Sequence, residues 1–405
     1  MNIFITLIIG MAIILIMLRR HYPIGPAILA GGLSIWLLQA PDLNHLWTAA
    51  YQTATKQRTY DLLLALYFVM CLEIELRTSG TLDGMVAALQ RLFSSKKVTL
   101  AIMPAFLGLL PSLGGARFSA PIVETASKGT AISVTEKATI NFWFRHIFEY
   151  SNPINPGMIL ACSIAMIPIS SLIVHLSWIS LVAFVLGWFI YLQPIKIGKH
   201  EDPEISPEEI RKNMADVALS LAPVIVNFIL VVFFNFGAAV SMGIVTVGMI
   251  FMLRFTCRVI NVKNVFVEAL DKKMILNIVC ILYFVQLLTV TGTLDAVVNA
   301  FKASTLPIPI VIASVSFIIG ILTGISQGHV AIVLPLVAAI APGDLNLISI
   351  AFVFGIAGQM ITPTHVCFTV TLDYFKADFF KTLRPILLVE SLLIIIFSLK
   401  TYFFA

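Results

Sequence analysis

The chain has 405 residues, of which 59% are hydrophobic and 12% are charged, and its formal net charge is +5. A typical soluble domain is about 45–50% apolar and about 25% charged, so this composition excludes an ordinary soluble domain and predicts that lipid surrounds most of the chain. The basic residues are scattered over short loops, as in the cytoplasmic loops of membrane proteins, which argues against a nucleic-acid-binding surface.

A membrane-spanning helix needs about 20 mostly apolar residues, and on this measure the sequence predicts about ten full spans. These spans lie near residues 3–18, 22–39, 60–77, 136–165, 170–192, 214–235, 238–256, 273–290, 346–375 and 383–401. Prolines inside 136–165 and 346–375 predict that these two spans are broken. Arg19 and Arg20 follow the first apolar run, whereas a signal peptide carries its charge before that run, so we expect an uncleaved first span.

Two further apolar segments, 98–127 and 306–341, contain residues that interrupt helices. The first segment includes LPSLGGARFSAP at 110–121, and the second includes LTGISQGHVAIVLP at 322–335. Broken backbone at membrane depth is tolerated only where it is buried in protein or lines a cavity. Two breaks in matching positions indicate the binding site of a transporter, so we expect two facing re-entrant hairpins.

The distribution of charge predicts the orientation of the chain. If the N-terminus lies outside, most of the 26 Lys and Arg residues fall on cytoplasmic loops, which is the distribution that the positive-inside rule favours. The same threading places the C-terminus outside. The hydrophilic segment 193–213 has three prolines and charges of both signs, and it is expected to be a cytoplasmic linker.

The sequence also contains an internal repeat. SGTLDGMVAAL at 79–89 resembles TGTLDAVVNAF at 291–301, and the same offset of 212 residues relates Arg117 to His329. NPIN at 152–155 aligns with TPTH at 362–365 at an offset of 210 residues. Because each half has an odd number of crossings, the second half is expected to lie upside down. We therefore predict an all-α polytopic membrane protein with a first inverted repeat at 1–192, the linker at 193–213 and a second inverted repeat at 214–405.

The two hairpin tips supply the predicted substrate-binding residues. Glycines let the backbone turn and expose its amides, and helix N-termini at such a break carry partial positive charge, which suits a carboxylate. An arginine adds a planar donor group, and a histidine in the repeat-related position can couple proton movement. The alternatives are an arginine that pairs with an acid or reaches the cytoplasmic surface, and a histidine that is a buried structural group. The predicted residues are Ser112, Gly114, Gly115, Arg117, Ser326, Gln327, Gly328 and His329.

The two proline breaks supply the predicted coupling-ion site. Hydroxyl and amide oxygens and unwound carbonyls coordinate Na⁺ in transporters, so either Na⁺ or H⁺ is expected as the coupling ion. The alternative is a packing kink whose polar groups satisfy one another. The predicted residues are Ser151, Asn152, Asn155, Thr362, Thr364 and His365.

Two charged residues precede the first break. Arg145 and Glu149 are four apart in NFWFRHIFEYSNPINPG, so on a continuous helix they share a face and are expected to form an intramembrane ion pair. Glu149 as a proton or cation site is the alternative. The five cysteines are isolated and show no CxxC or Cys/His spacing, so the sequence predicts neither a disulfide framework, nor a zinc site, nor any metal beyond Na⁺.

No pairing of a nucleophile with a base, no HExxH, no Walker A motif and no Rossmann fingerprint is present in the sequence. We therefore expect a protein that is not an enzyme, that has no cofactor, and whose transport is driven by an ion gradient. The rivals are an ion channel or a cation/proton exchanger, an intramembrane enzyme, and a non-transporting membrane scaffold.

The segments LPSLGGARFSAPIV, EYSNPINPG, GISQGHVAIVLP and GQMITPTH resemble an uncharacterised prokaryotic integral-membrane permease family of the ion transporter superfamily. That superfamily includes dicarboxylate/sodium symporters, citrate carriers and gluconate permeases. The resemblance implies an inverted-repeat fold, a homodimeric scaffold and an elevator-type transport domain that holds both hairpins. The dicarboxylate symporters carry Ser-Asn-Thr triplets at their tips, where this chain has SLGG at 112–115 and SQGH at 326–329. The expected function is secondary active transport of a small organic anion, a carboxylate, across the cytoplasmic membrane.

Overall fold

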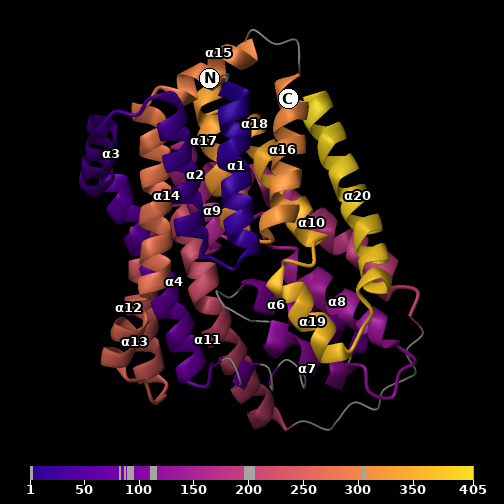
Figure 1. Cartoon of the computed structure of the whole chain (residues 1–405). Coiled ribbons are helices and arrows are strands. Elements are labelled where there is room, and N and C mark those ends of the chain that lie inside the picture. The colour runs from indigo at the N-terminus through magenta and orange to yellow at the C-terminus, as the bar shows by residue number, and fades with distance from the viewer. Residues whose placement is uncertain are drawn as a thin grey trace.

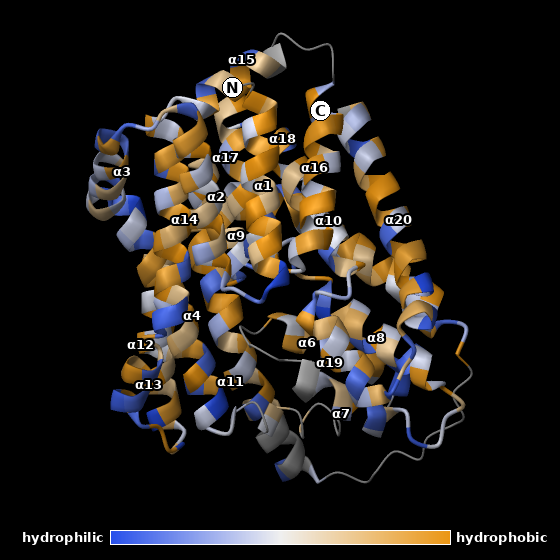
Figure 2. Ribbon diagram, in the orientation of Figure 1, coloured by the Kyte–Doolittle hydropathy of each residue, from blue (hydrophilic) through white to orange (hydrophobic). Residues whose placement is uncertain are grey.

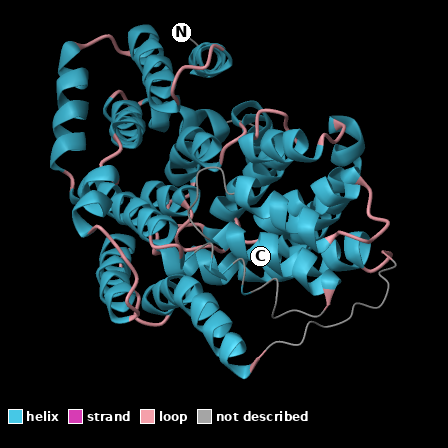
Figure 3. Ribbon diagram, turned by 90° about the horizontal axis from the view of Figure 1, so that it is seen from below, coloured by secondary structure: helices cyan, strands magenta, loops and turns pink. Residues whose placement is uncertain are grey.

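The computed structural model describes residues 3–81, 84–85, 88, 95–109, 116–195, 206–302 and 307–404, some of them by their backbone alone. Within these residues the chain forms nineteen α-helices and one π-helical segment, and Figure 3 shows no strand among them. The all-α class expected from the composition is therefore confirmed for the described part of the chain.

The first half of the chain begins with two apolar helices and ends with a long helix that finishes in a π-helical turn. Its elements are α1 (Ile3–Arg19), α2 (Ile24–Gln39), α3 (Leu43–Thr55), α4 (Gln57–Thr78), α6 (Lys96–Leu109), α7 (Ala116–Ala126), α8 (Val134–His146), α9 (Pro156–Ala165), α10 (Ile169–Gly187) and η1 (Trp188–Leu192).

The second half has the same order of long, short and broken helices. Its elements are α11 (Pro207–Val232), α12 (Ala238–Phe255), α13 (Val262–Glu268), α14 (Lys272–Val290), α15 (Thr293–Lys302), α16 (Ile308–Thr323), α17 (Ser326–Ile340), α18 (Leu345–Met360), α19 (Val366–Phe375) and α20 (Phe379–Phe404). The short helices α3, α13 and α15 lie outside the ten predicted spans and the two predicted hairpin segments.

Both broken spans are present. In the first, α8 ends at His146, and α9 begins at Pro156 after Asn155 has capped it by accepting a hydrogen bond from the backbone N–H of Gly157 at 2.8 Å. Pro156 fits the first helical position because the backbone N–H that it lacks would have no partner there. In the second, α18 ends at Met360 and α19 begins at Val366.

The second hairpin turns as its glycine predicts. Helix α16 ends at Thr323, and Gly324 follows with a left-handed φ of 66°, a backbone conformation that is unfavourable for residues with a Cβ. Helix α17 begins only two residues later, at Ser326. In the first hairpin, α6 and α7 are its two arms, and the tip at 110–115 lies outside the described residues.

Five helices in the described part are long and apolar enough to cross a membrane, which is fewer than the expected ten full spans. They are 169–192, 214–232, 238–255, 272–290 and 379–403. Helices α1 and α2 are apolar but shorter than 18 residues. Helix α4 has 22 residues, but charged side chains, Glu73 and Glu75 among them, interrupt its apolar sequence. Figure 2 shows that hydrophobic residues dominate the long helices along most of their length.

Several local structures recur in the two halves at the spacing of the sequence repeat. Gly80 and Gly292 both have a left-handed φ, of 70° and 67°. Met166 ends α9 with φ 55° and ψ 40°, and Lys376 ends α19 with φ 53° and ψ 37°. Because non-glycine residues seldom adopt this conformation, its recurrence indicates that α9 and α19 are equivalent elements.

The packing of the hairpins on the broken spans also recurs. Gly108 of α6 lies against the backbone carbonyl of Arg145 in α8, and Gly320 of α16 lies against the backbone carbonyl of Gly355 in α18. Each contact is so close that a Cβ atom on the glycine would collide with the carbonyl oxygen. Glycine is therefore required where each hairpin arm crosses its broken span.

The end of each first arm is held by a side chain from the break. The Nδ2 of Asn152 donates to the backbone carbonyl of Leu109 at 3.0 Å, and the Oγ1 of Thr364 donates to that of Ile321 at 3.2 Å.

In Figure 1, α6, α7, α8 and α19 lie in the lower part of the molecule, whereas α9, α16, α17 and α18 lie above them. Both chain termini lie at the upper end (Figure 1).

Candidate functional site

A cavity of about 460 Å³ lies where the second hairpin tip and both breaks meet the long helices α4 and α14. One wall is mostly apolar and comes from Leu66, Val69 and Met70 of α4 and from Met274 and Ile278 of α14. The wall is not wholly apolar, because Glu73 of α4 and Asn277 of α14 also line the cavity. Asn277 is held in place because its Oδ1 accepts a hydrogen bond from the backbone N–H of Gly25 at 3.0 Å.

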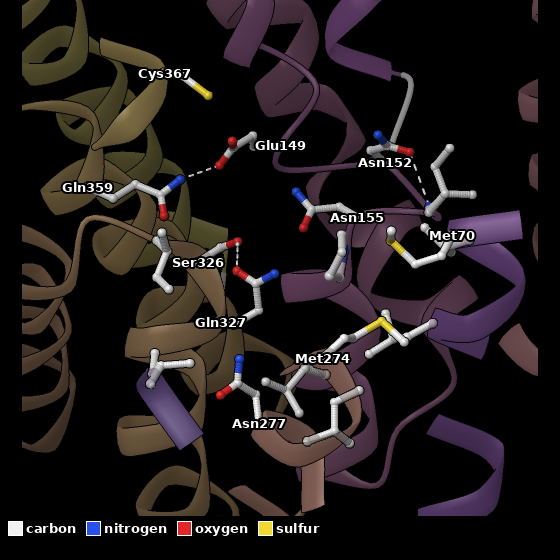
Figure 4. Close-up of a pocket in the computed structure, with 18 of the residues that line it drawn as sticks. Met70, Glu149, Asn152, Asn155, Met274, Asn277, Ser326, Gln327, Gln359 and Cys367 are labelled. Atoms are coloured by element: carbon white, nitrogen blue, oxygen red, sulfur yellow. Dashed lines mark hydrogen bonds between the residues drawn. The ribbon is translucent and has the colours of Figure 1, made fainter. Parts of the chain in front are cut away.

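The opposite wall is rich in amide side chains. Asn152 and Asn155 come from the first break, Ser326 and Gln327 from the start of α17, and Gln359 from the end of α18. In Figure 4, Gln359, Ser326 and Gln327 lie on the left, Met70 and Met274 lie to their right, and Asn152 lies on the same side as Met70. Amide groups both donate and accept hydrogen bonds, so this wall can bind a polar molecule whose other face contacts methionine and aliphatic side chains.

The first turns of α9 and α17 touch one another at the cavity. A Cβ atom added to Gly157 would contact the side chain of Ser326, so the N-terminal residues of the two helices lie side by side. Both helix N-termini carry partial positive charge from their aligned peptide dipoles, although Asn155 already accepts a hydrogen bond from the backbone N–H of Gly157. The junction of α9 and α17 therefore favours a negatively charged group in the cavity.

Glu149 and Gln359 join the two breaks. The Nε2 of Gln359 donates a hydrogen bond to the Oε2 of Glu149, and Figure 4 shows this contact at the edge of the cavity. The other carboxylate oxygen, Oε1, lies 3.9 Å from the Nε2 of His146. The carboxylate of Glu149 is therefore shared between residues from both halves of the chain.

The described residues show no salt bridge for the expected ion pair between Arg145 and Glu149. Helix α8 ends at His146, so Glu149 does not continue the helical face on which Arg145 lies. The Nη1 of Arg145 donates to the backbone carbonyl of Leu107 at 3.2 Å, and no hydrogen bond between Arg145 and Glu149 is found within the described residues. A spacing of four residues predicts an ion pair only where the helix is continuous.

The predicted substrate residues of the second tip are divided between two environments. Ser326 and Gln327 line the cavity, but Gly328 packs against Thr323 and does not line it. His329 is fully buried against Gly355 of α18, and neither ring nitrogen has a hydrogen-bond partner in the part of the chain that the structure describes. His329 therefore contributes to helix packing and does not reach the cavity. Each step along α17 turns the next side chain around the helix axis, and at position 329 the side chain packs against α18.

The predicted residues of the first tip mostly fall outside the described part. Ser112, Gly114 and Gly115 lie in the segment 110–115, which the structure does not describe. Arg117 is the second residue of α7, and only its backbone is described. Arg117 and His329 were expected to face each other across a substrate. His329 does not line the cavity, so it is not in the expected position.

The three predicted coupling-ion residues of the first break have local partners. The Oγ of Ser151 lies 2.7 Å from the Oγ of Ser180, and Ser151 does not line the cavity. Asn152 uses its Nδ2 on the carbonyl of Leu109 and its Oδ1 on the backbone N–H of Ile154 at 3.1 Å. Asn155 caps α9. Asn152 and Asn155 therefore combine a structural role with a place in the cavity wall.

The three predicted residues of the second break are also hydrogen-bonded. The Oγ1 atoms of Thr362 and Thr364 lie 3.0 Å apart, and Thr364 packs against Gly324 of the hairpin tip. The Nδ1 of His365 lies 3.0 Å from the backbone carbonyl of Gln359. Of these three residues, His365 alone lines the cavity, so the two breaks do not place all six predicted side chains around one point.

Four cavity residues that matter for its chemistry were absent from the predicted set. Asn277 could have been identified from the sequence, because a polar side chain inside an apolar span is a functional candidate. Gln359 was visible as a polar residue next to the second break. His146 and Cys367 are more than 200 residues apart, and only the packing of α8 against α19 brings them together.

A family model described as "Protein of unknown function (DUF401)" matches residues 3–402, so the chain belongs to this family. A crystal structure of the YdaH transporter of Alcanivorax borkumensis, which is reported to have an unusual topology, has a similar fold, with a TM-score of 0.62. The similarity covers 90% of this chain and 89% of that one at 13% sequence identity, which shows a shared fold alone. No curated protein matches the sequence.

Proposed function

We propose that this member of the DUF401 family is a secondary active transporter that moves a small organic anion, a carboxylate, across the cytoplasmic membrane. The observation that carries this proposal is the cavity between the mostly apolar wall of α4 and α14 and the amide-rich wall of the breaks and hairpin tip. Its volume of about 460 Å³ suits a small organic molecule, since binding pockets for such ligands measure roughly 300–1,000 Å³. The fold shared with a solved transporter supports the same assignment.

The positive groups around the cavity support an anionic substrate. The first turns of α9 and α17 meet there, and Arg145 is also in the wall. The amides of Asn155 and Gln327 supply neutral donors that can complete the binding of a carboxylate. Arg117 at the start of α7 remains a further candidate for the same role.

The coupling ion, Na⁺ or H⁺, is proposed to bind next to the substrate at Glu149 and the first break. Glu149 is an acidic side chain that faces the cavity inside the helical bundle, which is a position typical of ion-coupling residues in transporters. The backbone carbonyls freed by the break and the side-chain oxygens of Asn152 and Asn155 offer ligands for Na⁺.

The two halves are proposed to be inverted repeats, and the two hairpins with their broken spans are proposed to move together as an elevator. The recurring glycine contacts, helix ends and hydrogen bonds of the two halves support this arrangement, as does the placement of the two hairpins toward opposite ends of the molecule in Figure 1. Helices α4 and α14 would form part of the static scaffold of a homodimer, with both termini outside.

Uptake into proteoliposomes tests the proposal. Full-length protein is reconstituted, and accumulation of radiolabelled mono-, di- and tricarboxylates is measured under an imposed Na⁺ gradient, an imposed pH gradient and neither. Uphill accumulation that depends on one gradient is expected, and Arg117→Ala should reduce it. Downhill flux of inorganic ions without accumulation of any carboxylate would favour a channel or an exchanger and would contradict the proposed function.

A further inference from the structure

Three potential metal ligands meet in the wall of the cavity, although no sequence motif connects them. His146 is the last residue of α8, His365 precedes α19, and Cys367 is the second residue of α19. One ligand atom of each of these residues lies within 4.8 Å of the ligand atoms of the other two. All three residues line the cavity, so an ion in the cavity could reach them.

We propose that His146, His365 and Cys367 bind a divalent transition-metal ion of the zinc class. Two imidazoles and one thiolate form a borderline-soft donor set that suits zinc and its neighbours in the first transition series. Hard cations such as Na⁺, Mg²⁺ and Ca²⁺ prefer oxygen ligands, so the two imidazoles and the thiolate are not ligands for the proposed coupling Na⁺, and the two proposed sites have only Glu149 in common.

The backbone holds both histidines in the tautomer that leaves Nε2 free to bind a metal. The Nδ1 of His146 lies 2.6 Å from the carbonyl of Phe142, and the Nδ1 of His365 lies 3.0 Å from the carbonyl of Gln359. A carbonyl can only accept, so each Nδ1 carries the proton and each Nε2 presents a lone pair. Metal-binding histidines are usually oriented by such a second hydrogen bond.

The thiol of Cys367 lies close to both imidazoles, because the ligand atoms of the three residues are within 4.8 Å of one another. The Nδ1 of His146 is engaged with Phe142, so its Nε2 is the nitrogen that remains available to a metal. The two imidazole rings are nearly perpendicular, with an interplanar angle of 87° and centroids 4.8 Å apart. Ligand atoms of a tetrahedral zinc site lie about 3.3–3.8 Å apart for bonds of about 2.0–2.3 Å, so small side-chain rotations would close the site.

A fourth ligand lies beside the three. The Oε1 of Glu149 is 3.9 Å from the Nε2 of His146, and Glu149 also lines the cavity. On binding, Cys367 would release its proton to water, and its thiolate together with the carboxylate of Glu149 would balance the two charges of the ion. Arg145 also lines the cavity, and its Nη1 donates to the carbonyl of Leu107.

Cobalt is the probe for this site. Purified full-length protein in detergent is treated with a chelator, and Co²⁺ is added while the absorption spectrum is recorded. We expect one equivalent of Co²⁺ to give a thiolate-to-cobalt charge-transfer band together with the intense visible bands of tetrahedral cobalt, and Zn²⁺ should displace it. Cys367→Ser should abolish the charge-transfer band, and Cys280→Ser, which changes another buried thiol in α14, should leave it intact.

Histidine variants and a chemical test of the native protein complete the experiment. His146→Asn and His365→Asn should each weaken Zn²⁺ binding by about 100-fold or more, because losing a ligand costs at least as much as losing a residue that orients one. In the unmodified chain, Zn²⁺ should protect Cys367 from alkylation, with the modified cysteine identified by mass spectrometry. An unchanged charge-transfer band in Cys367→Ser, or alkylation of Cys367 at the same rate with and without Zn²⁺, would overturn the proposal. Neither readout requires transport, so the result is independent of the uptake assay.

Discussion

Gln359 donates a hydrogen bond to Glu149, which lies 210 residues earlier in the chain. This separation equals the 210-residue offset between the two breaks, so the two residues occupy equivalent positions beside the breaks of the two spans. The two halves of the chain therefore contact each other directly at this pair of equivalent residues. The contact also places a carboxylate at the edge of the cavity, so the boundary between the halves is part of the proposed binding site.

Gln359→Leu should destabilise the protein. The substitution removes the donor to a carboxylate inside the bundle, and a hydrogen bond to a charged group contributes about 1.5–3 kcal/mol. The free energy of unfolding in mixed micelles is the measurement. Gln327→Leu is the matched control, because Gln327 forms only a marginal side-chain contact, at 3.5 Å, with Ser326, and it should change stability little. Equal losses in the two variants would contradict the importance of the Gln359–Glu149 contact.

Gln327→Leu should instead weaken transport. Gln327 lines the amide-rich wall, and the loss of one hydrogen bond worth roughly 0.5–1.5 kcal/mol should raise the KM for the carboxylate by about two- to tenfold. Initial uptake rates over a range of substrate concentrations give KM and the maximal rate separately. Gln57→Leu, on the exposed first residue of α4, should leave both values unchanged. A KM of Gln327→Leu equal to that of the unmodified protein would remove Gln327 from the binding site.

Gly320→Ala should destabilise the packing of α16 on α18. The added methyl group would collide with the backbone carbonyl of Gly355, and overpacking of this kind costs about 1–3 kcal/mol. Thermal unfolding in detergent is a suitable measurement. Gly248→Ala is the control within a helix, because no atom lies near the added group and alanine is favoured there by roughly 0.5–1 kcal/mol. The two substitutions should therefore shift the unfolding temperature in opposite directions, and shifts of the same sign would count against the close packing.

Cys257 reports the orientation of the chain without any substitution. It is exposed and follows α12, in a segment that the charge distribution places on the cytoplasmic side. A membrane-impermeant maleimide should therefore label it in inside-out vesicles and not in right-side-out vesicles, with Cys257→Ser as the control. In that background, Ala54→Cys on the exposed end of α3 should show the reverse pattern. Labelling of Cys257 from outside would invert the predicted topology.

The positions of the breaks were predictable because their causes are local. Pro153 and Pro156 cannot donate the hydrogen bonds of a helix, and Gly324 adopts a backbone conformation that is unfavourable for most residues. Helices α8 and α18 therefore end, and α9 and α19 begin, beside the predicted breaks, and α16 and α17 are separated at Gly324. Arg145 and Glu149 do not share the continuous helical face that their spacing of four residues implied, because α8 ends at His146.

The sequence by itself determined that the described chain is helical, that it is apolar enough to contain membrane-spanning helices, and that its two halves carry related breaks. Composition, proline and glycine act within a few residues, so their effects can be inferred without coordinates. Only the tertiary structure decided that Ser326 and Gln327 face the cavity while His329 packs against Gly355. It alone brought His146 together with Cys367, because such contacts depend on how distant helices pack and not on any spacing along the chain.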